Sequence, residues 1–178
     1  MGSYYYLAAQ LPYLVYGQAL PMSSAAFKAL AADMMSDADA ASLEDCTLDH
    51  ELAKPSSSSF INRWKEWERV LRLNLARGRF QKLKREGGTV EAPEYPANAA
   101  AVAKAALAME SPLEAEMFLD KARWDAIESF QGISTFSEDA MYAYLIKLLL
   151  MERRAAFKTE EGLTEYKALY AAILGEPK

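Results

Sequence analysis

The chain has 178 residues, of which 52% are hydrophobic, and this length and composition predict one domain with a sizeable buried core. Its formal net charge of −5 excludes a chain-wide binding surface for nucleic acid or for an anionic membrane. The longest apolar run, Met141–Met151, has 11 residues and includes Lys147, far fewer than the roughly 20 that cross a bilayer.

The N-terminal part of the chain predicts short elements. Residues 4–20 are aromatic and apolar and are divided by Pro12, which fits either a short strand or a short helix. Ser23 predicts the N-cap of a helix that continues to about Met35. Its apolar stripe, at spacings of three and four, consists of Phe27, Leu30 and Met34.

Residues 36–46 predict another short helix, and the serine-rich loop at 54–59 has the composition of a hinge. The longest predicted helix then runs from Phe60 to Arg85. One apolar stripe follows its length and is formed by Phe60, Trp64, Trp67, Leu71 and Leu75. A pair of glycines ends this helix, and two prolines extend the predicted loop over 87–96.

The second half of the chain also predicts helices. An alanine-rich helix over 97–109 is followed by helices over 113–130 and 137–158 and by a last one over 161–174. Serines at 111 and 137 are predicted N-caps, and the short link between the second and third of these helices makes them antiparallel neighbours. We therefore expect an all-α fold, a multi-helix bundle in which residues 1–178 form a single domain.

The predicted core centres on the helix 137–158, because it is apolar nearly all round. The side chains expected there are Tyr142, Leu145, Ile146, Leu148 and Leu149. They are expected to pack against Leu113, Met117, Leu119, Trp124 and Ile127.

Charge is segregated along the chain. Between Phe60 and Arg85 there are nine Lys or Arg residues and two acids, which gives +7, so the remainder carries 11 − 23 = −12. A basic helix on an acidic body is typical either of a partner-binding surface or of an ordinary solvated helix.

We expect Arg72, Arg77 and Arg79 to face outward, opposite the tryptophan stripe, and to bind an acidic partner. The alternative is a helical adaptor or nucleic-acid-binding protein that acts through helix 60–85. Burial of Trp64 and Trp67 favours a scaffold, and exposure of both rings beside the arginines favours nucleic-acid binding.

Candidate catalytic and metal-binding residues are few. One cysteine, Cys46, and one histidine, His50, fall short of the several Cys or His ligands of a structural zinc site. The acid pairs Glu114/Glu116 and Glu138/Asp139 fall in first turns of helices, where acids stabilise the helix dipole. The sequence contains neither a glycine-rich phosphate loop nor a persuasive hydrolytic triad. We expect no enzyme activity, no metal and no cofactor.

The single cysteine excludes a disulfide within the chain and fits a reducing compartment. The first residues lack the basic segment of a signal peptide. We therefore expect a cytoplasmic location.

Three segments resemble a small bacterial family of unassigned function whose genes lie among those for V-type ATPase subunits. They are Tyr4–Pro12; Ser111–Glu116 with Leu119, Asp120 and Trp124; and Ala143–Leu148 with Glu152, Arg153, Glu161 and Gly162. More distantly, Glu68, Asn74, Leu75 and Arg77 resemble helical segments of the funnel-shaped adaptor subunit of V/A-type ATPases.

That adaptor subunit is non-catalytic and seats the rotating central stalk on the membrane ring. The resemblance therefore implies a non-catalytic accessory or central-stalk component of a bacterial V-type ATPase. Its partners would be the central-stalk and membrane-ring subunits, and it would be peripheral to the membrane through that complex without being inserted in it.

Overall fold

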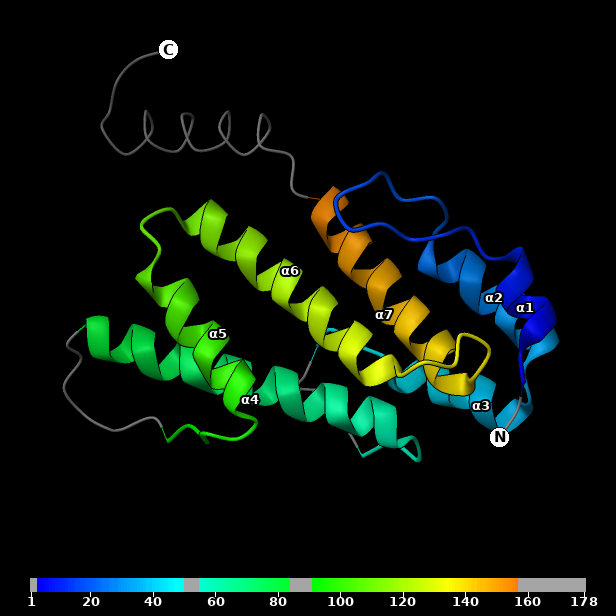
Figure 1. The fold of residues 1–178 in the computed structure, drawn as a ribbon, viewed down its shortest axis with the longest axis horizontal. Helices are drawn as coiled ribbons and strands as arrows, with labels where there is room; N and C mark the ends of the chain where they lie inside the picture. Colours follow the sequence, from blue (N-terminus) through cyan, green and yellow to red (C-terminus); the bar gives the residue numbers. More distant parts are fainter. Residues whose placement is uncertain (1–2, 50–54, 84–90, 157–178) are drawn as a thin grey trace, which may run out of the picture.

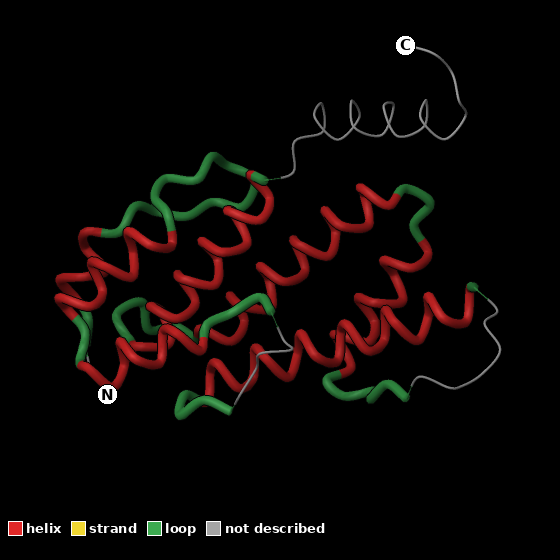
Figure 2. Tube along the Cα trace, turned by 180° about the vertical axis from the view of Figure 1, so that it is seen from behind, coloured by secondary structure: helices red, strands yellow, loops and turns green. Residues whose placement is uncertain are grey.

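The computed structural model describes residues 3–49, 55–83 and 91–156. Its helices are α1 (Tyr5–Gln10), α2 (Ser24–Met34), α3 (Asp37–Ser42), α4 (Ser59–Lys82), α5 (Ala97–Ala108), α6 (Pro112–Gln131) and α7 (Glu138–Ala155), with a 3₁₀ turn, η1, at Leu43–Asp45. About 70% of the described residues are helical and none is in a strand, which confirms the all-α prediction (Figure 2). The helix predicted over 161–174, the glycine pair at 87–88 and His50 lie outside the described residues.

Side-chain caps explain where most of the helices begin. A serine hydroxyl accepts a hydrogen bond from the backbone N–H three residues later at α2, α3, α4, α6 and α7. The caps are Ser23, Ser36, Ser58, Ser111 and Ser137. Helix α4 begins at Ser59, one residue earlier than predicted, so the loop predicted over 54–59 ends one residue earlier.

The bundle is built around α6, which contacts α4, α5 and α7 (Figure 1). Helices α1, α2 and α3 gather at one end of the bundle, where α2 packs against α7. At the other end α5 packs along the second half of α4, where an added Cβ on Gly78 would overlap the Leu107 side chain. Small residues thus allow α4 and α5 to approach closely, as the alanine-rich composition of α5 indicates.

The predicted core is largely confirmed. Tyr142, Leu145, Ile146 and Leu148 of α7 are buried, as are Leu119, Trp124 and Ile127 of α6, and Leu149 is partly buried. The prediction is wrong for Leu113 and Met117, which are 56% and 47% exposed. The antiparallel pairing explains the difference: Arg153, near the end of α7, contacts Asp120, and α7 ends at Ala155, so it does not extend along the first turns of α6.

The N-terminal segment forms a helix where the sequence also allowed a strand. Helix α1 buries Leu7, and the described residues offer no neighbouring strand with which it could pair. Before it, the Tyr4 N–H donates to the Phe136 carbonyl at 2.7 Å, and the Tyr4 hydroxyl donates to the Asp39 carboxylate. This hydrogen bond from Tyr4 is the main reason that the pKa of Asp39 lies below its ordinary value.

Burial of α7 predicts a large difference between two leucine truncations. Leu145→Ala should lower the free energy of unfolding by about 2–5 kcal/mol, because it leaves a cavity in the core. The matched change Leu113→Ala should alter it by no more than about 0.5 kcal/mol, because that side chain is exposed. Urea unfolding of both variants measures the difference, and equal losses would contradict the packing of α6 described above.

The contact between Tyr4 and Asp39 predicts a pH dependence. A lowered folded-state pKa stabilises the fold above the unfolded pKa, and this stabilisation is lost as the pH falls through the folded pKa. Tyr4→Phe should therefore cost about 1.5–3 kcal/mol at neutral pH. That cost should begin to shrink as the pH falls below about 4, the ordinary pKa of an Asp, and it should disappear once Asp39 is protonated in the folded state as well. Urea unfolding of wild type and variant across this range tests it, and a pH-independent difference would argue against a charge-assisted bond.

Candidate functional site

Arg72 does not face outward, and the prediction that it lies opposite the tryptophan stripe is wrong. Its side chain is 34% exposed, and its Nε donates to Glu68 Oε1 at 2.7 Å. One terminal nitrogen donates to the Leu48 carbonyl at 2.7 Å. The physical reason is the position of Glu68, which lies one turn earlier on the buried side of α4 and requires a neutralising partner.

Arg77 and Arg79 occupy different surroundings. Arg79 is exposed, with its guanidinium 3.8 Å from the Glu116 carboxylate on α6. Arg77 is half-buried and lines a hollow between α4 and α5 together with Glu94. The three predicted partner-binding arginines therefore do not form one outward surface.

Other cations of α4 also have partners within the chain. Arg69 pairs with Glu66. Arg63 donates to the Phe130 carbonyl, and its guanidinium lies over the Phe130 ring. Lys82 donates to the Leu107 carbonyl. Lys84 and Arg85 lie outside the described residues. Much of the positive charge on α4 thus serves internal contacts.

The tryptophan stripe of α4 is buried. Trp64 and Trp67 are each 1% exposed, their rings stack at 6.1 Å between centroids, and Trp64 Nε1 donates to the Thr47 carbonyl. Neither ring is accessible to a nucleotide base, because stacking requires an open ring face.

A buried charge network joins α4, α6 and α7 and is the main polar feature of the interior. Arg123, which is 4% exposed, donates from Nε to Glu68 Oε2 at 2.9 Å and from a terminal nitrogen to Glu68 Oε1 at 3.1 Å. Its other terminal nitrogen donates to Asp120 at 3.2 Å. Arg153 of α7 donates to the same Asp120 oxygen, and Arg72 completes the network at Glu68.

The network contains three guanidinium groups and two carboxylates. Burial opposes the charge of Arg123, but the attraction of Glu68 and Asp120 outweighs it and raises the pKa of that guanidinium. Both carboxylates accept hydrogen bonds from two arginines each, so each buried acid is paired with two cations. The arrangement holds helices together.

Sequence reasoning missed this network, although one signal was present. Glu68 falls within the apolar stripe of α4, and Arg123 stands directly before Trp124 on α6. A charged residue on a buried helix face requires a partner of opposite charge. The sequence does not show which residues from distant segments supply those partners.

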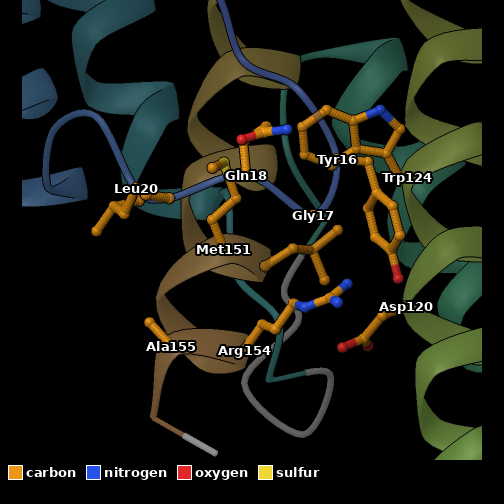
Figure 3. Close-up of a pocket in the computed structure, with 11 residues that line it drawn as sticks. Tyr16, Gly17, Gln18, Leu20, Asp120, Trp124, Met151, Arg154 and Ala155 are labelled. Carbon is orange, nitrogen blue, oxygen red and sulfur yellow. The ribbon is translucent and has the colours of Figure 1, made fainter.

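A pocket of about 310 Å³ lies beside the network, between the loop at 16–20 and helices α6 and α7 (Figure 3). The Arg154 guanidinium lies over the Tyr16 ring, 5.0 Å from its centroid, and the Tyr16 and Trp124 rings meet edge to face. Burial raises the pKa of Tyr16. One terminal nitrogen of Arg154, which lines this pocket, is buried without a hydrogen-bond partner among the described residues.

Cys46 is buried, and burial raises the pKa of its thiol, which disfavours the reactive thiolate. The described residues contain no group of three His, Cys, Asp or Glu side chains that could hold a metal ion. Glu114, Glu138 and Asp139 lie in the first turns of α6 and α7, as predicted, whereas Glu116 lies beyond the first turn of α6 and the prediction is wrong for it.

No protein-family model matches the chain, and neither a curated protein nor a solved structure is significantly similar to it. No helix in the described ranges is long and apolar enough to cross a membrane.

The charge network predicts very different costs for two neighbouring substitutions on α4. Glu68→Gln should lower the free energy of unfolding by about 3–5 kcal/mol, because it leaves the buried Arg123 without its main counter-charge. Glu66→Gln should cost about 0–1 kcal/mol, because the Glu66–Arg69 pair is about half exposed. Denaturant unfolding compares them, and a small loss for Glu68→Gln would show that the network contributes little.

Proposed function

We propose that this chain is a non-catalytic accessory or central-stalk component of a bacterial V-type ATPase. In this role it resembles the adaptor subunit described above, links the rotor to the membrane ring, and is cytoplasmic and peripheral to the membrane through the complex. The proposal starts from the sequence resemblance. One structural observation supports it: residues that carry the resemblance meet in the buried charge network.

Glu68 belongs to the segment that resembles the adaptor subunit, whereas Asp120 and Arg153 belong to segments that resemble the small ATPase-associated family. In the structure Arg123 bridges Glu68 and Asp120, and Arg153 contacts Asp120. The resemblance thus concerns residues that connect the helices. This favours a mechanical role that depends on the shape of the whole bundle.

The proposed role requires resistance to bending and sliding, because an adaptor between rotor and ring transmits force. Bidentate and shared guanidinium contacts fix the register of α4 against α6 and of α6 against α7. Sliding one helix by a turn would separate buried charges from their partners, at a cost of about 3–5 kcal/mol. This favours a stiff body.

The alternative is a helical adaptor or nucleic-acid-binding protein acting through α4. It has less support, because the Trp64 and Trp67 rings are buried and Arg72 is held by Glu68 and Leu48. A nucleic-acid site would need its cations free to contact phosphates.

Affinity purification tests the proposed function. A tagged copy of the full chain, expressed at native level, should co-purify central-stalk and ring subunits of the V-type ATPase from native membranes. The Glu66→Gln variant should do so equally, because that ion pair lies at the surface. Recovery of the tagged chain without any ATPase subunit would refute the proposal.

Fluorescence anisotropy with labelled DNA and RNA tests the alternative. We expect no binding tighter than about 10 μM at physiological salt. Submicromolar affinity would favour the nucleic-acid function instead, if the logarithm of the binding constant falls linearly with the logarithm of the salt concentration.

A further inference from the structure

One face of the molecule exposes large apolar side chains from segments far apart in the sequence. The face comprises α1, the start of the loop after it, and the connection between α6 and α7. The Tyr5 and Phe136 rings are in contact, and residues 11–14 line one groove together with the α6–α7 connection. Its exposed side chains are Tyr5 (58%), Tyr6 (82%), Tyr13 (89%), Ile133 (101%) and Phe136 (38%). We call this set the aromatic face. A concentration of exposed aromatic residues is typical of a protein-binding surface.

A groove of about 460 Å³ lies within the aromatic face. Tyr13 and Phe136 form part of its border. Its apolar lining comes from both sides, with Ala8, Leu11 and Leu14 from the N-terminal segment and Met141 and Tyr144 from α7. The surface therefore offers a recess and protruding rings together, which is the geometry that accepts the apolar ridge of a helix.

The chain segments that form the aromatic face carry no charged side chain. Neither residues 3–27 nor residues 129–137 include any Asp, Glu, Lys or Arg. The charged residues among those that line the groove are Glu128 and Lys147, which pair with each other at 3.1 Å. A charged group on a partner would lose its water here without gaining a counter-charge. The complementary partner surface is therefore apolar and uncharged.

The backbone beneath the aromatic face is fixed before any partner binds. The Tyr4 N–H donates to the Phe136 carbonyl at 2.7 Å and ties α1 to the α6–α7 connection. The Tyr144 hydroxyl donates to the Pro12 carbonyl at 2.9 Å and holds the loop that carries Tyr13. Leu7 anchors α1 in the core at 1% exposure. Binding here costs little backbone entropy, which favours affinity.

We infer that the aromatic face is the docking surface for a helix with an uncharged apolar side on a protein of the ATPase complex. This inference rests on the proposed function and names the surface that performs it. It takes the place of the basic surface predicted on α4, because Arg72 is held by Glu68 and the three predicted arginines do not form one outward surface. A second copy of the chain is a less suitable occupant, since two bodies of net charge −5 would repel one another.

A matched pair of tyrosine substitutions tests the inference. Tyr6→Ser combined with Tyr13→Ser removes two exposed rings of the aromatic face, whereas Tyr95→Ser removes an equally exposed ring, at 82%, from the loop before α5. Binding of each full-length protein to purified V-type ATPase stripped of this chain is measured by biolayer interferometry. Circular dichroism confirms that the variants are folded.

The double variant should bind at least about tenfold more weakly than wild type, as expected when aromatic contacts at the centre of an interface are lost. Tyr95→Ser should bind like wild type. Arg77→Glu with Arg79→Glu should retain binding. Raising the salt from about 0.1 to about 1 M, where exposed charges are screened, should leave wild-type affinity within about twofold.

Equal binding by wild type and the double tyrosine variant would overturn the inference while leaving the proposed function intact. So would steep weakening by salt together with loss of binding in the double arginine variant, which would assign the interface to α4. Analytical ultracentrifugation that shows a wild-type dimer dissociated by the tyrosine changes would assign the face to a second copy and also overturn it. Failure of wild type to bind the ATPase would refute the proposed function, and this inference with it.

Discussion

The interaction on which the bundle depends is the bidentate contact between the Arg123 guanidinium and the Glu68 carboxylate. Both groups are almost fully buried, at 4% and 3% exposure, so each needs the other. Asp120 and Arg153 extend the contact to α7, and Arg72 extends it to the chain near Leu48. Apolar packing alone would tolerate several helix registers, whereas this network favours one.

The same network reduces the positive charge that α4 can offer to a partner. Its positive charge first suggested a surface for an acidic partner or a nucleic acid. In the folded protein, Arg72 neutralises a buried acid and Arg63 and Lys82 donate to backbone carbonyls of α6 and α5. Net charge along a helix therefore overestimates the charge available to a partner, because each internal pair removes one cation from the surface.

The surface that we propose for docking lies instead on segments that carry no charge. The N-terminal segment and the α6–α7 connection are uncharged in sequence and carry exposed rings in the structure. Hydrogen bonds of Tyr4 and Tyr144 fix both segments, so the exposed rings stand on a rigid base. A body held in one register by the charge network, with exposed rings on a fixed backbone, is what the adaptor role that we propose requires.

The sequence by itself determined the all-α class, the serine caps at Ser23, Ser111 and Ser137, and the buried stripe of α4, because capping and helical periodicity are local properties. Only the tertiary structure decided that Leu113 and Met117 are exposed, that Arg72 turns toward Glu68, and that Tyr13 lies near Phe136. These outcomes depend on where one helix ends against another and on which distant residue meets a buried charge. Neither property is encoded in the spacing of residues along a single helix.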